Sequence, residues 1–431
     1  MQVKAVVVGY GDRGSIYADY AFRYPEELKI ETVVDPDPFR LKLAKEKFNL
    51  TDTQCLSDFD ELLIKGKIAD FAIVATMDQL HYEQAKALML QNYHLLLEKP
   101  IVNNSKELQE LKQIAEERNL KIMVGHVLRY TPFYGAIKQA ILDGEIGEIM
   151  HMETSEFVGT VHADCCYIRG KWNKEESCGS GMLLAKCCHD FDLLCWLNNQ
   201  TVPTDVVSYG GRNFIVPEKA PKDSAEKCYE DCPHIDTCRF SAKALYIDNC
   251  LMPHYSYMPL CNALKKKYNE LTVEEKLESL KTTNPMGVCS YKTGSDLVDH
   301  QTVMLKFKNG STATHSMITA VPRGGRKIHI IGTEGEIEGF FEGNKFSIRK
   351  FDFATSTYKE TQVDVTDKII AGVGHGGGDI KLIEDVVKRM QGEKPSIAST
   401  DIRDSINGHE CVYAAERSRL GNICVKMNQD A

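Results

Sequence analysis

Residues 4–14, KAVVVGYGDRG, are the stretch of sequence that decides the fold of the N-terminal half. The apolar run is typical of a buried strand, and the three glycines after it have the G-x-G-x-x-G spacing that leads into a helix. The first glycine permits a tight turn, the second lets a pyrophosphate approach the backbone, and the third allows close helix packing. Free N–H groups at the helix start favour an anion. The loop therefore predicts a dinucleotide site formed by Gly9, Gly11, Asp12, Arg13 and Gly14.

Asp35 ends the next apolar run, IETVVD, at about 20 residues beyond the glycines. A carboxylate at this position accepts hydrogen bonds from the ribose hydroxyls and repels a 2′-phosphate. The sequence therefore favours NAD over NADP. Arg40 follows closely and weakens that preference.

Buried strand-like runs continue to alternate with amphipathic helical patterns as far as Gly125, and this alternation predicts βαβ units. We expect residues 1–125 to form a Rossmann domain, a doubly wound α/β fold with a parallel sheet. Residues 126–431 change to longer strands with alternating polarity, and Asn309-Gly310 marks a hairpin. They predict an α+β domain with a large, open, mostly antiparallel sheet. A Cys-rich insertion is expected at about 206–268.

Length and composition limit the classes of protein to consider. A chain of 431 residues exceeds one hydrophobic core, which agrees with two domains. A formal net charge of -9 argues against a nucleic-acid partner. The chain lacks the run of about 18 apolar residues that a membrane-spanning helix needs, so no membrane partner is expected. Fifteen cysteines without an export signal predict a reducing, cytoplasmic location.

Several motifs resemble the Gfo/Idh/MocA family of sugar and inositol oxidoreductases. They stand in the family's order, and they are Ala75–Leu88, Glu98-Lys99-Pro100, Gly125–Tyr134, Cys188–Leu197, Gly374–Asp379 and Ala414–Gly421. The resemblance implies a nicotinamide at the carboxyl ends of the Rossmann strands and a sugar or polyol between it and the second sheet. It also implies a homo-oligomer, dimer or tetramer, paired through the exposed sheet face.

The resemblance assigns roles to residues of these motifs. Lys99 contacts the reacting hydroxyl, and His189 hydrogen-bonds that hydroxyl and acts as general base. The further cofactor contacts it implies are Thr76, His81, Glu98 and Lys99, with helix capping an equally good interpretation of His81. The implied substrate contacts are Lys99, His126, Arg129, Tyr130, His189 and His375.

One position departs from the family pattern. Many relatives carry an aspartate four residues before the histidine, where this chain has Ala185. Lys186 is then a third catalytic candidate, and Asp190 or Asp192 is a candidate to orient His189, although each also fits a surface charge or salt bridge.

Three functions follow from these motifs. The first is NAD-dependent oxidation or reduction of a secondary hydroxyl on a sugar, inositol or sugar derivative. The second is a redox-neutral glycosidase or lyase that works through a transient keto-sugar. The third is a non-catalytic regulator that binds NAD or sugar, which the retained Lys99 and His189 disfavour.

Cys228, Cys232 and Cys238 cluster in KCYEDCPHIDTC, within the insertion. In a reducing compartment such a cluster is a candidate structural zinc site. The sequence leaves the fourth ligand open among His234, Cys250 and the Cys187-Cys188 pair. An iron–sulfur cluster and free buried thiols are the alternatives.

Overall fold

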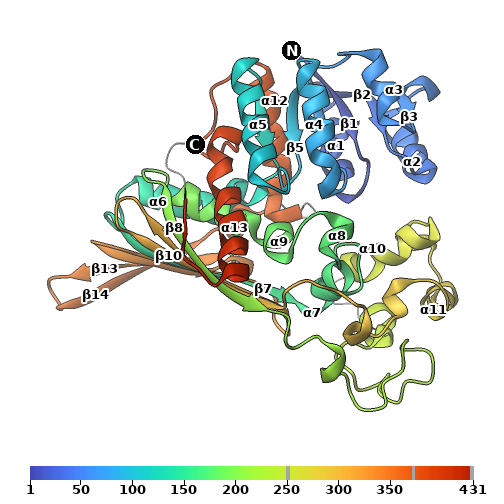
Figure 1. Cartoon of the computed structure of the whole chain (residues 1–431). Coiled ribbons are helices and arrows are strands. Elements are labelled where there is room, and N and C mark those ends of the chain that lie inside the picture. Colours follow the sequence, from blue (N-terminus) through green and yellow to red (C-terminus); the bar gives the residue numbers. More distant parts are fainter. Residues whose placement is uncertain (249–252, 371–373, 428–431) are drawn as a thin grey trace.

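The computed structural model describes residues 1–248, 253–370 and 374–427. Two sheets organise these residues (Figure 1), one in the N-terminal half and one in the C-terminal half. Helices α9 (Met182–Leu197) and α13 (Ile402–Gly421) lie between the two sheets. The chain thus has two sheet layers joined by a buried helical layer.

The N-terminal sheet has six parallel strands in the order β3-β2-β1-β4-β5-β6. This is the strand order of a doubly wound dinucleotide-binding domain, so the Rossmann prediction is confirmed. Its strands are β1 (Val3–Val8), β2 (Leu28–Val34), β3 (Cys55–Leu56), β4 (Phe71–Val74), β5 (His94–Leu97) and β6 (Ile122–Val124). Its helices are α1 (Asp12–Arg23), α2 (Pro38–Phe48), α3 (Phe59–Lys65), α4 (His81–Leu90) and α5 (Ser105–Glu117).

Local sequence explains where these elements begin and why they pack. All four residues of β4 are buried, as expected for a strand covered by helices on both faces. The Asn104 side chain accepts a hydrogen bond from the Glu107 N–H and caps α5, and Asp37 caps α2 through the Phe39 N–H.

The C-terminal sheet has nine strands in the order β14-β13-β12-β11-β7-β10-β9-β8-β15. Every neighbouring pair is antiparallel except β7 with β10, so the prediction of a large, mostly antiparallel sheet is confirmed. The strands are β7 (Ile149–Gly159), β8 (Pro203–Gly211), β9 (His300–Phe307), β10 (Thr312–Val321), β11 (Gly325–Gly332), β12 (Gly335–Phe340), β13 (Lys345–Asp352), β14 (Thr357–Asp364) and β15 (Val425–Lys426).

One C-terminal helix returns to the first domain. Residues of α12 (Gly378–Met390) share a hydrophobic core with β1 and α1, and Figure 1 shows this orange helix beside the Rossmann helices. The residues that bring α12 into that core are Leu382, Ile383, Val386 and Val387. The predicted domain boundary lies between residues 125 and 126. Packing adds α12, which comes from the C-terminal part of the chain, to the nucleotide-binding half.

The long connection between β8 and β9 carries the insertion. It contains α10 (Pro253–Leu264) and α11 (Val273–Lys281), joined by irregular segments. The remaining helices are α6 (Pro132–Leu142), α7 (Thr160–Ala163) and α8 (Glu175–Cys178). Among the helices of the described ranges, none combines the length and apolar character needed to cross a membrane.

Candidate functional site

The glycine loop has the geometry that its spacing predicts. Gly9 has a φ of 86°, and a Cβ on Gly14 would lie 1.9 Å from the Gly9 carbonyl oxygen, so neither position tolerates a side chain. Gly11 caps α1 and no side chain takes that capping role. The first backbone N–H groups of α1 thus point at a position suited to a pyrophosphate.

Asp35 lies buried at the carboxyl end of β2. Its carboxylate accepts hydrogen bonds from the backbone N–H groups of Tyr10 and Asp37, each at 2.8 Å. The Arg40 guanidinium is 3.5 Å from the same carboxylate. Each carboxylate oxygen has a second acceptor position, so the group fits a ribose, while Arg40 places a positive charge at the same end of the site.

Arg13 uses its side chain to join the glycine loop to two other elements. Its guanidinium donates to Glu98 and to Asp379 of α12, both at 2.6 Å, and to the Tyr17 hydroxyl at 2.7 Å. The His375 Nδ1 lies 3.0 Å from the other Asp379 oxygen. Burial raises the pKa of Asp379, but Arg13 and His375 outweigh it and hold that pKa well below its usual range. This network connects Arg13, Glu98 and His375.

Thr76 and His81 support the two loops that border the site. Thr76 donates to the Gln84 side chain at 2.6 Å, and its methyl group lies against Gly9. The His81 Nδ1 is 2.7 Å from the Pro100 carbonyl oxygen. His81 is buried, so it fixes the loop that carries Lys99.

Lys99 meets α9 at the position of the missing aspartate. Its Nζ donates a hydrogen bond of 2.8 Å to the Ala185 carbonyl oxygen. One bond leaves two ammonium hydrogens for other acceptors. The backbone of Ala185 therefore orients the Lys99 ammonium.

His189 lies one turn farther along α9 and faces His126. Their Nδ1 atoms are 3.4 Å apart. Burial lowers the pKa of His189 well below its ordinary value, and the positive charges of Lys99 and Arg326 lower it further. Burial, Arg129 and Lys99 do the same to His126. Both imidazoles are therefore neutral near neutral pH, and His189 is able to accept a proton.

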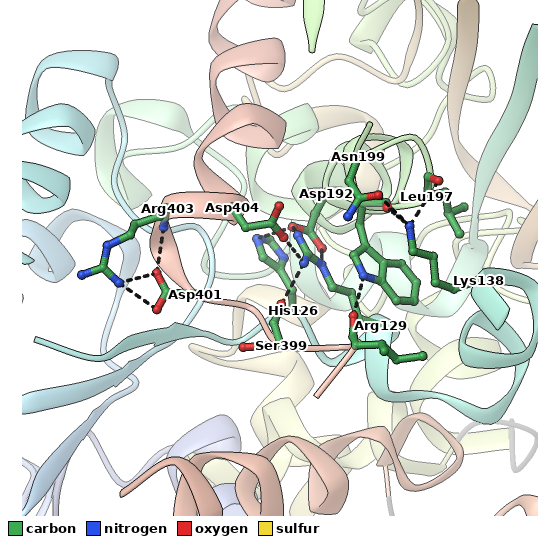
Figure 2. Close-up of polar contacts among 12 residues, drawn as sticks. His126, Arg129, Lys138, Asp192, Leu197, Asn199, Ser399, Asp401, Arg403 and Asp404 are labelled. Atoms are coloured by element: carbon green, nitrogen blue, oxygen red, sulfur yellow. Dashed lines mark hydrogen bonds and ion pairs between the residues drawn. The ribbon is translucent and has the colours of Figure 1, made fainter. Parts of the chain in front are cut away.

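Arg129 holds the carboxylate behind His126 (Figure 2). Its guanidinium donates to both oxygens of Asp192, at 2.7 and 2.5 Å, and it also contacts Asp404 and the Ser399 carbonyl oxygen. Asp192 is 3.6 Å from His126 Nε2. The Arg129 donors are thus used within the protein, and its contacts favour a positioning role over substrate binding.

Tyr130 is likewise tied to the protein, because its hydroxyl donates to Asp385 of α12 at 2.8 Å. Lys186 pairs with Glu156 of β7 at 3.2 Å. Arg326 of β11 bridges Glu156, at 2.7 Å, and Asp190, at 2.9 Å. Asp190 is thereby paired on the sheet side of α9, so Asp192 is the carboxylate near the histidines.

Comparison with known proteins identifies the family. The family model described as "Oxidoreductase family, NAD-binding Rossmann fold" matches residues 3–126, and the one described as "Oxidoreductase family, C-terminal alpha/beta domain" matches residues 138–426. The chain belongs to the Gfo/Idh/MocA oxidoreductase family.

Individual relatives of this Gfo/Idh/MocA protein have diverse names. The putative oxidoreductase YteT of Bacillus subtilis is 27% identical over 370 residues, which cover 84% of this chain and 83% of YteT. The 2,7-anhydro-N-acetylneuraminate hydratase of Escherichia coli is 28% identical over 149 residues, which cover 34% of this chain and 38% of the hydratase. A levoglucosan dehydrogenase solved with NADH and levoglucosan has a TM-score of 0.70 at 16% identity and covers both chains fully, at 100% each.

Lys171 and Trp172 lie near the site of this Gfo/Idh/MocA chain but belong to none of the motifs identified in its sequence. Trp172 donates from Nε1 to both oxygens of Asp78, at 3.2 Å each, and so links the second domain to the loop after β4. The Lys171 Nζ lies 4.2 Å from the centre of the Trp172 ring. Burial lowers the pKa of Lys171, with Asp78 and Arg40 close enough to act on it. Lys171 therefore lies near Asp78 and near Arg40, which borders the glycine loop.

The predicted metal ligands lie together. Cys228, Cys232 and Cys238 line one cavity in the insertion, with Cys289 as a fourth thiol. Of the fourth ligands that the sequence left open, His234 lines the same cavity, Cys250 lies outside the described residues, and Cys187 lies elsewhere, beside Asp190 and His315.

Proposed function

We propose that this Gfo/Idh/MocA protein oxidises or reduces a secondary hydroxyl of a sugar, inositol or sugar derivative, with NAD as its cofactor. The observation that carries the proposal is the convergence of Lys99 from the Rossmann domain and His189 from α9. Bound NAD supplies the hydride acceptor or donor. Levoglucosan and NADH in a protein of the same fold support this choice of substrate and cofactor class.

Lys99 and His189 have different roles in the proposed proton transfer. Lys99, held by the Ala185 carbonyl, donates a hydrogen bond to the substrate oxygen and stabilises negative charge on it. His189 is neutral and takes the hydroxyl proton. In the reduction direction the same groups return the proton to the oxygen.

Asp192 and His126 set the tautomer of His189. Two neutral imidazoles that face each other through Nδ1 share one proton, so one donates and the other accepts. The Asp192 carboxylate favours a proton on His126 Nε2. His126 Nδ1 then accepts the bond from His189, and His189 Nε2 carries the free lone pair. His126 and Arg129 are positioning residues in this proposal, in place of the substrate contacts that the resemblance implied.

The residues that would hold the cofactor lie in the Rossmann domain. The glycine loop would hold the pyrophosphate, Asp35 the adenosine ribose, and the Glu98–Lys99 loop the nicotinamide end. Asp35 supports NAD over NADP because its charge repels a 2′-phosphate. Thr76, His81 and Arg13 act by holding these loops, and His375 borders the substrate through Asp379.

Redox-neutral cleavage is the second candidate function. The observations that favour it are Ala185 in place of the aspartate, the Lys186–Glu156 pair as an additional acid and base, and the relative named as a hydratase. Incubation with NAD and a panel of sugars, inositols and anhydrosugars separates the two. Reduced cofactor accumulates under the first function, whereas cleaved or hydrated product without net NADH indicates the second. Binding of NAD and sugar with no turnover would indicate the regulator.

We further propose a cytoplasmic homo-oligomer that pairs through the open face of the second sheet. On β9, Val303 and Leu305 are buried against α9 and α13, while Met304 is 55% exposed on the other face. Tyr209 of β8 and Ile318 of β10 are also exposed there. Exposed apolar side chains on one face are typical of an interface, and light scattering measures the oligomeric state.

A further inference from the structure

Four cysteines line one cavity, and one of them is about 50 residues from the other three in the sequence. Three belong to the insertion, Cys228, Cys232 and Cys238, and the fourth, Cys289, follows α11. Cys228 and Cys289 are buried, and the other two are partly buried. Thiols seldom gather in fours by packing alone, so this arrangement calls for a chemical explanation.

The backbone brings the fourth cysteine to the other three. The Cys228 N–H donates to the Gly287 carbonyl at 2.9 Å, and the Cys289 N–H donates to the Glu226 carbonyl at 2.8 Å. Lys227 and Val288 form an antiparallel bridge between them. Main-chain pairing therefore places Cys289 beside Cys228 without any help from the thiols themselves.

Hydrogen-bond donors point at the sulfurs. The Arg169 guanidinium lies 3.3 Å from the Cys228 Sγ, and the Ala242 N–H donates to the same atom at 3.4 Å. The Phe240 N–H donates to the Cys238 Sγ at 3.4 Å. N–H groups and a buried cation around sulfur stabilise thiolates, the form in which cysteine binds metal.

We infer that Cys228, Cys232, Cys238 and Cys289 form a tetrathiolate metal centre. Cys289 takes the place that the sequence left open. His234 also lines the cavity, with its Nε2 2.6 Å from the Lys222 carbonyl oxygen, but it is only partly buried, whereas Cys289 is buried beside Cys228. Binding releases the thiol protons to solvent and needs no oxidant.

Zinc and an iron–sulfur cluster share this ligand set. A zinc ion with Zn–S bonds of about 2.3 Å draws its sulfurs to roughly 3.8 Å of one another. Within the described part of the chain, three ligand atoms within 4.8 Å of one another occur only at Cys187, Asp190 and His315. No three of the four cavity sulfurs therefore lie within 4.8 Å of one another. A single zinc ion would draw them closer together, whereas a cluster would hold them farther apart.

The cysteine cluster is connected to the Rossmann domain through the segment that carries Arg169 and Trp172. Arg169 joins the two, because it contacts Cys228 and donates to the Val288 and Phe240 carbonyls, while three residues later Trp172 bonds Asp78 of the Rossmann domain. A metal that joins residues 228–241 to Cys289 would therefore stabilise the segment of Arg169 and Trp172, which contacts the nucleotide-binding half. The inference stands independently of the substrate proposed above.

Elemental analysis of the full-length protein, purified without oxygen or chelator, tests the inference. We expect either one zinc per chain, or about four iron and four acid-labile sulfide per chain, and X-ray absorption with sulfur as the sole first neighbour. Zinc identifies a single ion and iron with sulfide identifies a cluster. Sub-stoichiometric metal together with four titratable thiols, or with disulfides, would overturn the centre.

Cys289→Ser and Cys261→Ser form a matched pair of variants. Cys261 belongs to the same insertion but does not line the cavity. We expect C289S to lose at least about half of the metal and C261S to retain it. Equal metal content in both, or nitrogen and oxygen as the main neighbours in wild-type absorption data, would contradict the four-thiolate assignment. The absorption data are from the wild type, so the test stands even if C289S fails to fold.

Discussion

The Nδ1 atom of His126 lies 3.4 Å from the Nδ1 atom of His189. His126 follows β6 at the start of the second domain, and His189 lies on α9. Asp192 and Arg129 extend this contact into a buried chain, Arg129–Asp192–His126–His189. In the function proposed above, these neighbours fix the tautomer of His189 as the base.

Lys99→Met tests the main proposal. Removing the ammonium should lower kcat by about 10²–10⁴-fold because charge on the substrate oxygen is no longer stabilised. NAD binding, followed by fluorescence, should change little. Lys106→Met, at an exposed lysine of α5, is the control and should keep full activity. Wild-type turnover in K99M would exclude Lys99 from the chemistry.

The pH profile of kcat/KM tests His189 as the base. Its lowered pKa predicts that activity persists from neutral pH to well below 6.5 and falls only when the imidazole becomes protonated. His126→Ala should lower kcat/KM at least about tenfold, whereas His126→Asn, whose amide oxygen reaches the place of Nδ1, should recover part of the loss. An acid limb at 6.5 or above in the wild type would contradict this assignment.

Protein stability should fall as the pH drops below 6.5. Burial lowers the pKa values of His126 and His189 in the folded state, and burial and His126 lower that of His409 to about 3. The unfolded chain then binds protons that the folded chain does not, with a cost of about 1.4 kcal/mol per pH unit for each histidine. Urea unfolding at pH 7.5, 6.5 and 5.5, about one unit apart, measures how the free energy of unfolding changes with pH. His409→Gln should reduce that change.

Arg129→Ala and Arg403→Ala compare a buried with an exposed ion pair in the same region (Figure 2). R129A leaves Asp192 buried without its partner and should lower the free energy of unfolding by about 3–5 kcal/mol. R403A removes a solvent-exposed pair with Asp401 and should cost no more than about 1 kcal/mol. Equal losses would show that Arg129 is not a buried anchor.

Asp35→Ser tests the cofactor preference. Losing a charged acceptor for the ribose hydroxyls should raise the KM for NAD about 10- to 100-fold. The NADP to NAD ratio of kcat/KM should rise, since the repulsion is gone and Arg40 remains. Asp37→Asn, at the neighbouring cap of α2, should leave the ratio near that of the wild type. An unchanged ratio in D35S would remove Asp35 as the determinant.

Much of the fold could be predicted from the sequence because the patterns that specify it involve residues close together in the chain. The G-x-G-x-x-G spacing and the buried strands predict the Rossmann domain, and Asn309-Gly310 predicts the β9–β10 hairpin. These features depend on backbone freedom and on alternating polarity within a few residues. The parallel pairing of β7 with β10 depends on residues about 160 positions apart and has no local signal.

The candidate site divides in the same way. Family motifs name Lys99 and His189, but the partners of Arg13, Arg129 and Tyr130 are carboxylates hundreds of residues away or on another helix. Lys171 and Trp172 reach the cleft only because their segment folds back towards Asp78. A sequence shows which groups are available, and contacts over such separations follow from packing.

The sequence by itself determined the βαβ units of the Rossmann domain, the glycine loop and the acidic end of β2, since each follows from residue type and short spacing. Lys99 and His189 were named as candidates by the resemblance to the family. Only the tertiary structure decided that Ala185 offers its carbonyl to Lys99, that His126 faces His189, and that Cys289 joins the cysteines of the insertion. The physical reason is that burial and pairing energies depend on neighbours that the fold, and not the chain order, brings together.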